Sequence, residues 1–475
     1  MVADRARPVL SAEVFIVPLG GGRHLVYAPL RRSGFVGNAR VVNVLADLKD
    51  GRYDPAADPG GALAEFLRQL EIVDAGPERR PITAFAGDPL PTTLTLFLTT
   101  ACNLRCTYCY ASAGDTPVKA MRLETATRGI DFVASNAVKK GQRNFDVAFH
   151  GGGEPTANWK VMTGAYDYAR AKADELGLTL NAASASNGVL RDDQVDWIVG
   201  HLNGVSLSYD GLPEAHDRHR LTVAGQGSSH LVAKTLRRFD AAKFPYGIRV
   251  TVTLDQIPRL ADGVEYIFAH FRPLRVQVEP AYQLGRWAEA ASAETDQFIA
   301  AYREAQARAA RYGQQITYSA ARVGTLVNHF CGISQDGFAL SPDGNVSACY
   351  EVFSEDNPLA DVFFYGKPDE GPGGGYRFNL PVLNDLRGQA VEHREFCRGC
   401  FAKWHCAGDC YHKSLTVNGR GEFAGSDRCH VTRELTKDQI LARIEAAGGY
   451  FWHEPWAEGE FEGASAQSRG KEILA

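Results

Sequence analysis

Ten cysteines limit what this chain can fold into, because they fall in two groups separated by a long cysteine-free stretch. Three lie within residues 102–109 and seven within residues 331–429. Cysteines that only fill a core would scatter among buried positions. Residues 1–8 are charged and lack the apolar stretch of a signal peptide, so we expect a cytoplasmic protein whose thiols stay reduced. Grouped, reduced thiols indicate metal binding rather than disulfides.

Length and composition narrow the class of protein. A chain of 475 residues is too long for one ordinary core, which predicts two or three domains. It is 45% hydrophobic and 23% charged, as is typical of a soluble globular protein. The net charge of −5 gives no reason to expect nucleic-acid binding, and the apolar runs are far shorter than the roughly 18 residues that cross a bilayer. Neither nucleic acid nor membrane is therefore an expected partner.

The first ninety residues read as a small unit of their own. Apolar and alternating stretches at Glu13–Pro18 and Arg23–Ala28 predict a hairpin that turns at Gly20–Gly22. Apolar residues at spacings of three and four predict helices over Asn38–Lys49 and Ala62–Ile72.

Strand and helix patterns alternate over residues 93–313, which implies a parallel sheet with outer helices. The expected strands are Leu94–Thr100, Phe145–His150, Thr179–Ser186, Val205–Tyr209, Ile248–Leu254 and Arg275–Pro280. Helical patterns cover Arg122–Ala137, Trp159–Leu176, His230–Lys243 and Glu294–Tyr312. An open doubly wound sheet and a partial barrel both fit this order. In either fold, the active site lies at the carboxyl ends of the strands.

The alternation is lost after residue 320, where bound metal is a plausible source of stability for a cysteine-rich region. The stretch Gly366–Gly375 reads as a loop. A last helix is expected over Arg433–Ala447, followed by an aromatic cluster and a polar tail, Glu458–Ala475.

The first cysteine group has the spacing CX3CX2C and follows the first expected strand. Three thiolates, from Cys102, Cys106 and Cys109, can hold three corners of a cubane cluster and leave one iron open. An open metal position is where a substrate or cofactor binds, whereas a structural zinc site usually has four protein ligands. The spacing therefore favours a catalytic iron–sulfur cluster.

This segment, with Tyr108 before its third cysteine, resembles the signature of radical S-adenosylmethionine (SAM) enzymes. In that family, the amino and carboxylate groups of SAM chelate the open iron of a [4Fe–4S] cluster. Cleavage of SAM then gives a 5′-deoxyadenosyl radical that abstracts a hydrogen atom. The resemblance implies an α/β fold with a partial (β/α)6 TIM-like barrel and the activity of an oxidoreductase.

Motifs at later strand ends resemble the SAM-binding segments of the same family. Glu154 follows Gly152-Gly153, as in the Gly-Gly-Glu motif that binds the methionine amino group, and Ser186-Asn187 resembles the stretch near the ribose. The segment that begins at Ser208 resembles one found in the peptide-modifying branch, where Ser, Asp and Arg contact the ribose and the methionine carboxylate. The resemblance assigns cofactor contacts to Tyr108, Gly152, Gly153, Glu154, Ser186, Asn187, Ser208, Asp210 and Arg220. Arg249 could also pair with a carboxylate.

The second cysteine group resembles the SPASM extension of radical SAM enzymes, which houses two auxiliary [4Fe–4S] clusters; spacing alone also allows zinc. The family pattern assigns Cys397, Cys400, Cys406 and Cys429 to one cluster, and Cys331, Cys349 and Cys410 to the cluster nearer the active site. That second cluster lacks a fourth cysteine. His329, water, substrate or an open iron remain alternatives for this position.

Two features bear on the substrate. Anaerobic sulfatase maturases, which share both cysteine regions, usually carry an acidic residue directly after the second SPASM cysteine. Here that position is Tyr350, followed by Glu351, and both are candidate bases. The N-terminal unit resembles the winged-helix element with which maturases of ribosomally made peptides (RiPPs) recognise a leader peptide, by adding it as a strand at a sheet edge.

The sequence therefore predicts a radical SAM peptide maturase that abstracts a hydrogen from a precursor peptide and installs an intramolecular thioether or carbon–carbon crosslink. SAM, three [4Fe–4S] clusters and a flavodoxin-like or ferredoxin-like electron donor are the expected cofactors and partner. Alternatives are a sulfatase-maturase-type, formylglycine-forming enzyme, an iron–sulfur electron-transfer protein and a zinc-stabilised peptide-binding protein. The expected domains are a peptide-recognition unit and linker (1–90), a partial barrel (91–320), a SPASM domain (321–440) and a helix end with a polar tail (441–475).

Overall fold

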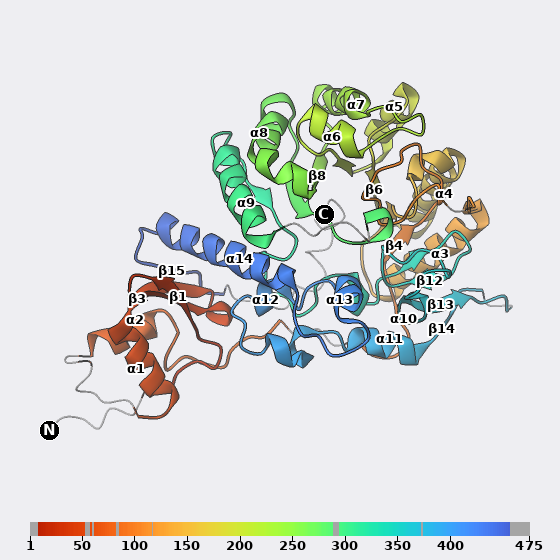
Figure 1. Ribbon diagram of the computed structural model, residues 1–475. Helices are drawn as coiled ribbons and strands as arrows, with labels where there is room; N and C mark the ends of the chain where they lie inside the picture. The colour runs from red at the N-terminus through yellow and green to blue at the C-terminus, as the bar shows by residue number, and fades with distance from the viewer. Residues whose placement is uncertain are drawn as a thin grey trace.

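A computed structural model describes residues 8–52, 58, 61–81, 85–115, 117–287, 294–371 and 374–456. The chain forms two sheets, and its N-terminal and C-terminal segments lie next to each other (Figure 1). The expected tail Glu458–Ala475 lies outside the described residues. Within the described part of the chain, no helix is long and apolar enough to cross a membrane.

The main sheet has eleven strands within the described residues, in the order β10-β9-β8-β7-β6-β5-β4-β11-β12-β13-β14. All six expected strands are present, and they pair in parallel in sequence order. Their bounds, with the short edge strand that follows, are β4 (Thr93–Leu96), β5 (Asn144–Phe149), β6 (Thr179–Ser186), β7 (Gly204–Ser208), β8 (Tyr246–Val252), β9 (Arg275–Pro280) and β10 (Ile316–Thr317). The sheet stays open, because β4 pairs on its outer side with β11 instead of closing onto β10.

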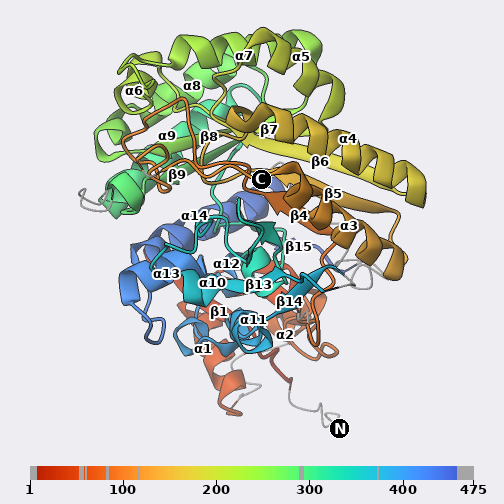
Figure 2. The same cartoon turned by 90° about the vertical axis from the view of Figure 1, so that its right-hand side faces the viewer.

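Helices cover one face of this parallel sheet, and the cysteine-rich C-terminal segments lie on its other side (Figure 2). The covering helices are α3 (Leu123–Lys139), α4 (Trp159–Leu176), α5 (Asp192–His201), α6 (Pro213–His219), α7 (Ser229–Ala242), α8 (Leu260–His270) and α9 (Thr295–Ala310). In β8, Ile248, Val250 and Val252 are buried in the core. The intervening Arg249 and Thr251 line an internal cavity, so the two faces of the strand have different roles.

The region after residue 320 continues the same sheet. β11 (Ala339–Leu340) pairs in parallel with β4, and β12 (Val346–Ser347), β13 (Phe364–Pro368) and β14 (Tyr376–Phe378) follow antiparallel. Gly366 pairs with Phe378, so the stretch expected to be a loop begins inside a hairpin strand. The helices here are α10 (Ala360–Phe363), α11 (Leu380–Arg387), α12 (Lys403–Cys406), α13 (Tyr411–Asn418) and α14 (Asp427–Ala446). The last of these starts before the expected Arg433.

The N-terminal unit contains the expected hairpin, β1 (Phe15–Gly20) with β2 (Arg23–Ala28), and the two expected helices, α1 (Ala39–Lys49) and α2 (Ala62–Gln69). Two further strands were not predicted. β3 (Ser33–Asn38) pairs with β2, and β15 (Phe451–His453), from the expected aromatic cluster, closes the other edge of β3. This four-stranded sheet is therefore built from both ends of the described chain.

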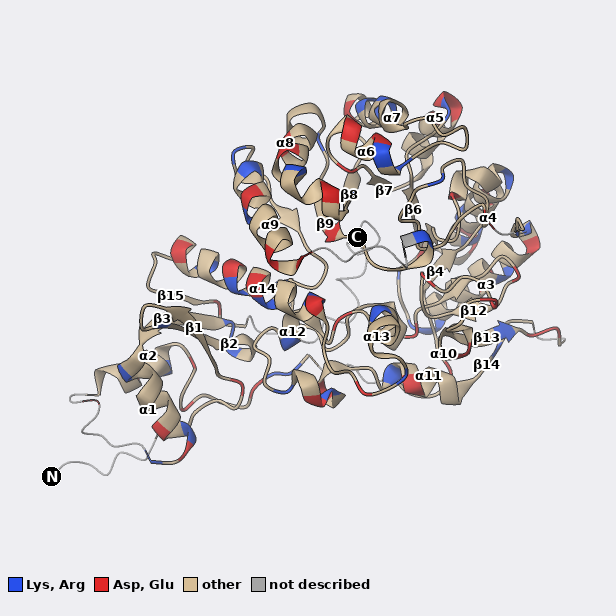
Figure 3. Cartoon of the chain, viewed as in Figure 1, with Lys and Arg blue, Asp and Glu red and all other residues tan. Residues whose placement is uncertain are grey.

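Buried contacts fix the two ends of the chain to each other. Trp452 of β15 is 7% exposed, and its ring stacks 6.5 Å from that of Tyr27. The Lys403 ammonium lies 2.8 Å from the Glu13 carboxylate, and both side chains are almost buried. Further along, charges of both signs mix on α9 and α14 (Figure 3), where Arg303 pairs with Glu434 at 2.8 Å.

We expect Trp452→Ala to loosen the N-terminal sheet, because truncating a buried tryptophan removes about 3–5 kcal/mol of packing. Backbone amides of β2 and β3 should then exchange hydrogen roughly a hundredfold faster or more in mass-spectrometric hydrogen exchange. Tyr450→Ala is the matched control, because Tyr450 is 82% exposed and its loss should leave exchange nearly unchanged. Equal exchange in both variants would show that β15 does not hold the sheet.

Candidate active site

One large cavity runs along one face of the parallel sheet and reaches the carboxyl ends of its strands at His150 and Ser208. Its volume is about 1420 Å³, which is ample for a cofactor together with a segment of peptide. Cys106 and Cys109 line it, and so does Cys331 from the second cysteine group. The structure thus brings both groups of thiols to one space.

The CX3CX2C loop leaves β4 and is held in place by contacts to its sulfur and carbonyl atoms. The Cys102 sulfur lies 3.4 Å from the Leu104 amide and 3.6 Å from the Asn187 side-chain amide. Arg286 donates to the Cys106 carbonyl oxygen at 3.0 Å. Amide donors to sulfur are typical of the surroundings of iron–sulfur clusters, whose potentials they tune.

Desolvation makes the thiols of Cys102 and Cys106 hard to ionise without a cation. Desolvation and the negative charge of Glu154 raise the pKa of Cys102 to about 12. Desolvation, opposed by Arg220, raises the pKa of Cys106 to about 11. A metal cluster needs thiolates and supplies the missing positive charge, so these surroundings suit a bound metal cluster.

Glu154, at the end of β5, is 3% exposed and bonded on both carboxylate oxygens. Ser186 donates its hydroxyl to one oxygen at 2.9 Å, and the Asn187 amide donates to the other at 2.8 Å. Burial nevertheless raises the pKa of Glu154. Gly153 permits the close approach to the cysteine loop, because a Cβ there would overlap the Ala101 carbonyl oxygen. The strand ends expected to bind the cofactor are therefore one connected group.

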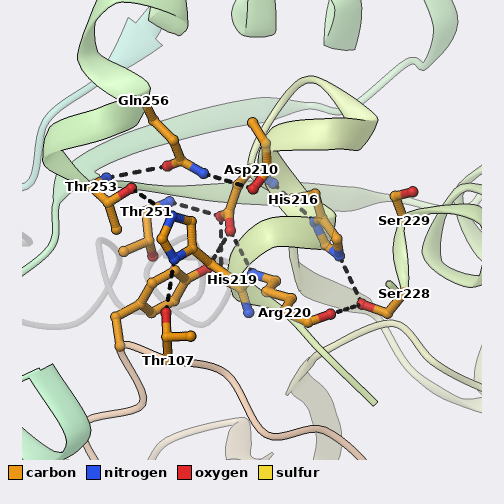
Figure 4. A network of polar contacts seen from close by, with 12 residues as sticks. Thr107, Asp210, His216, His219, Arg220, Ser228, Ser229, Thr251, Thr253 and Gln256 are labelled. Atoms are coloured by element: carbon orange, nitrogen blue, oxygen red, sulfur yellow. Dashed lines mark hydrogen bonds and ion pairs between the residues drawn. The ribbon is translucent and has the colours of Figure 1, made fainter. Parts of the chain in front are cut away.

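Asp210 and Arg220 form a buried ion pair at the end of β7 (Figure 4), not the surface pair that two charged residues usually make. The Arg220 Nε lies 2.8 Å from Asp210 Oδ2, with the two side chains 7% and 0% exposed. The Thr251 amide and the Tyr108 hydroxyl also donate to the Asp210 carboxylate. These contacts, above all that with Arg220, hold the pKa of Asp210 below its usual range despite burial.

This arrangement separates the roles of the pair. Arg220 lines the cavity and lies over the Tyr108 ring at 5.1 Å, whereas the Asp210 side chain is enclosed. Ser208 lines the cavity directly. Arg220 and Ser208 are thus placed to touch a ligand, and Asp210 is placed to orient Arg220.

His219 and His216 form hydrogen bonds next to the ion pair of Asp210 and Arg220 (Figure 4). His219 Nδ1 lies 2.8 Å from the Thr107 hydroxyl, within the cysteine loop, and its Nε2 lies 3.1 Å from Asp255. His216 Nε2 lies 3.0 Å from the Ser228 hydroxyl, which donates to the Arg220 carbonyl oxygen at 2.6 Å. These bonds tie α6 to the cysteine loop and so fix the position of Arg220.

The seven later thiols influence one another in two separate sets. Burial raises the pKa of Cys349 well above its usual value, and the charges of Glu351, Cys410 and Cys331 raise it further. Burial likewise raises the pKa of Cys406, with contributions from Asp409, Cys429, Cys400 and Cys397. The division of the seven thiols between two clusters stays a prediction.

Among the described residues, no three or more His, Cys, Asp or Glu side chains gather closely enough to hold a single metal ion.

His329, the candidate fourth ligand, is 3% exposed and lines the same cavity as Cys331. Burial lowers its pKa, so the ring is neutral and able to bind metal. Its Nδ1 has no hydrogen-bond partner among the described residues, and its ring packs against Phe85 at 6.2 Å.

The candidate bases differ in their surroundings. Lys413, His412 and Arg249 overcome burial and lower the pKa of Glu351 to about 2, which makes it a weak base. Its carboxylate lies 2.8 Å from His412 Nδ1. Tyr350 is 44% exposed and lines the cavity.

His150, which directly precedes the glycine motif, was not proposed as a site residue from the sequence. It lines the cavity, and its ring lies 5.3 Å from that of Tyr350. Burial and the charge of Arg249 lower its pKa to about 4, so it is neutral at pH 7. Its Nδ1 is buried without a hydrogen-bond partner in the described structure. A histidine at a strand end is the only signal the sequence carried for it.

Comparisons with known proteins agree with this geometry. The sequence model of the Radical SAM superfamily matches residues 96–262. The sporulation killing factor maturation protein SkfB of Bacillus subtilis is 28% identical over 179 residues, which cover 37% of this chain and 39% of SkfB. A cysteine-type anaerobic sulfatase-maturating enzyme of Clostridium novyi is 24% identical over 181 residues, covering 36% of this chain and 48% of that enzyme. The chain spans about half the length of the curated relatives it matches.

Solved structures share the fold over more of the chain. Native anSMEcpe with bound AdoMet superposes with a TM-score of 0.59 at 18% identity, covering 75% of this chain and 98% of that one. SuiB of Streptococcus suis, bound to S-adenosylmethionine, gives a TM-score of 0.50 at 13% identity, covering 88% and 99%. The expected radical SAM fold is confirmed, as an open sheet. Residues 96–262, which include the three-cysteine loop after β4, form a domain of the radical SAM superfamily.

Proposed function

We propose that this chain is a peptide maturase that removes a hydrogen atom from a ribosomally made precursor peptide and closes an intramolecular thioether or carbon–carbon crosslink. The observation that carries the proposal is the shared cavity, which is lined by Cys106 and Cys109 of the catalytic loop and by Cys331 of the second cysteine group. A substrate held there touches both regions.

The chain's own residues would hold the cofactor. Cys102, Cys106 and Cys109 would bind the catalytic cluster, and Glu154 would accept the methionine ammonium of SAM. Arg220 and Ser208 would bind its carboxylate and ribose, with Gly152, Gly153, Ser186, Asn187 and Tyr108 shaping the site. Asp210 is a positioning residue in this scheme, because its carboxylate is enclosed by Arg220, Thr251 and Tyr108.

When bound, the cluster and SAM supply a 5′-deoxyadenosyl radical, which takes one hydrogen atom from the peptide. Closing the crosslink then releases one proton and one electron from the peptide. His150, a neutral ring with a free buried nitrogen, and Tyr350 and Glu351 beside it, are the groups placed to take the proton. Its low pKa makes Glu351 a weaker base than His150, and the Tyr350 hydroxyl accepts a proton only once it is deprotonated.

The second cysteine group would take the electron. We assign Cys397, Cys400, Cys406 and Cys429 to one auxiliary [4Fe–4S] cluster, and Cys331, Cys349 and Cys410 to the other, with His329 available beside it. The first electron would come from a flavodoxin-like or ferredoxin-like donor. The second would return through the cluster that lies closer to the cavity.

Residues 1–90 would recognise the leader of the precursor peptide. Their sheet and helices fit a small peptide-binding unit, and the fold similarity with SuiB extends over 88% of this chain. We keep the expected divisions at residues 91–320 and 321–440, and assign β15, from residues 441–475, to the N-terminal sheet that it completes.

Formylglycine formation is the second candidate, because one curated relative is named an anaerobic sulfatase-maturating enzyme. Tyr350 stands where those enzymes usually carry an acidic residue, and the adjacent Glu351 is committed to His412. Both observations favour crosslink formation over this alternative.

Anaerobically reconstituted protein should hold about twelve irons and, once reduced, convert SAM to 5′-deoxyadenosine. Cys106→Ser should abolish the conversion and lower the iron to about eight, because only the catalytic cluster is lost. Iron analysis and chromatography of the nucleoside measure both results. Colourless protein that binds zinc, or the absence of 5′-deoxyadenosine from the wild type, would overturn the proposal.

Asp210→Asn should weaken SAM binding at least about tenfold, because Arg220 loses the buried charge that orients it. Anaerobic calorimetry of the reconstituted variant measures the Kd. Asp193→Asn is the matched control, since Asp193 pairs with Arg191 on the surface and its side chain is 63% exposed. An unchanged Kd for Asp210→Asn at normal iron content would contradict the positioning role.

A short precursor peptide, once found in a reading frame beside the gene for this chain, would distinguish the two reactions. Crosslinking should remove two hydrogens from that peptide, retain all its sulfur and leave no group that reacts with hydrazide. A hydrazide-reactive aldehyde at a former cysteine or serine, seen by tandem mass spectrometry, would support formylglycine formation instead.

A further inference from the structure

Arg249 projects into the cavity from the middle of the parallel sheet. It lies on β8, beside Ser208 of β7 in the strand register. The neighbouring strands present small side chains to the cavity, including Ser206 and Ser184. A long cation among such short neighbours has open space around it, and Arg249 is indeed exposed to the cavity although its strand is buried.

The described residues give the Arg249 guanidinium no hydrogen bond or ion pair. The two acidic groups whose pKa values its charge lowers are bound elsewhere. Glu279 accepts from the Ser319 amide at 2.7 Å and pairs with Arg428, and Glu351 pairs with His412. Arg249 therefore acts on both carboxylates from a distance.

The other groups near Arg249 do not neutralise it. Its charge also lowers the pKa values of Tyr110 and His150, and both side chains are half-buried and uncharged at pH 7. An arginine stays charged in proteins, and its planar fork of N–H donors matches a carboxylate in two parallel bonds. The donors of Arg249 are thus available to a bound ligand.

We propose that Arg249 binds a carboxylate of the peptide substrate, so that the modified segment carries an aspartate, a glutamate or a free C-terminus beside the attacked residue. This inference rests on the proposed function and names its substrate class. Arg249 lines a partly enclosed cavity together with other cations, among them Arg220 and Lys413, and a charge-assisted pair is stronger there than on the surface.

The carboxylate of SAM is the other source of the same chemistry, and Arg220 and Arg249, two of the cations that line the cavity, lie in different surroundings. The charge of Arg220 lowers the pKa values of Cys106, Tyr108 and Asp210, which lie beside the catalytic loop. The charge of Arg249 lowers the pKa values of Glu351, Glu279 and His150, of which Glu351 belongs to the second cysteine region. SAM has one methionine carboxylate. In the proposed function Arg220 binds it, so Arg249 is available to bind a carboxylate of the peptide.

Arginine-selective labelling with phenylglyoxal tests this assignment on the full-length, reconstituted protein with saturating SAM. The probes are acetyl-Gly-Ser-Asp-Ser-Gly-amide and its counterpart with asparagine in place of aspartate, both in the millimolar range. The aspartyl peptide should slow labelling of Arg249 about tenfold relative to the asparaginyl peptide, and mass spectrometry measures the adduct. Exposed Arg23 serves as the internal control and should label equally in all samples.

Complete protection of Arg249 by SAM alone would assign it to the cofactor and overturn the proposal. Equal protection by the two peptides would overturn it as well. The same preparation is assayed for 5′-deoxyadenosine, so that a failure of the proposed function is seen separately from a failure of this inference.

Two variants separate binding from structure. Arg249→Gln should abolish the preference for the aspartyl over the asparaginyl peptide in calorimetry, while Arg249→Lys, which keeps the charge but not the fork, should retain part of it. A merely structural role would weaken both peptides equally and leave their ratio unchanged. That result would also contradict the proposal.

Discussion

The cost of ionising buried thiols is the constraint on which this structure depends. Cys349 is buried and Cys406 and Cys410 are half-buried, and desolvation raises the pKa of each thiol above its usual value. Thiolates in such surroundings need positive charge, which a bound cluster would supply. The strands of the C-terminal region are short, so under the proposed function the stability of this region would depend on metal more than the stability of the large parallel sheet does.

The open sheet places the cysteine-rich region and the catalytic loop around the same cavity. Because β4 pairs with β11, the cysteine-rich region is a continuation of the sheet and not a separate body beside it. The sheet therefore fixes Cys331 and the catalytic loop relative to one cavity. The buried pair of Asp210 and Arg220 fixes a cation in the same cavity, and the bonds of His219 and His216 hold that pair against the cysteine loop.

The hydrophobic pattern of the sequence predicted the long strands and helices, because that pattern determines where they form. β6 and β9 and helix α4 have the bounds expected from the sequence, because alternating and amphipathic runs determine them. Strands β11 and β12 are two residues long, and β15 is three, so none has a periodicity to detect, and only long-range pairing reveals them. The spacing of the cysteines predicted which thiols would serve as cluster ligands, and the structure places Cys106, Cys109 and Cys331 around one cavity. By contrast, the enclosure of Asp210, the low pKa of Glu351 and the neutral His150 depend on residues far away in the sequence.

Transfer of a hydrogen atom from a peptide to the cofactor is tested most directly with a precursor peptide that carries deuterium on carbon at the attacked position. The account predicts that deuterium appears in 5′-deoxyadenosine in step with formation of the crosslinked peptide. Unlabelled 5′-deoxyadenosine, with the peptide unchanged, would contradict it.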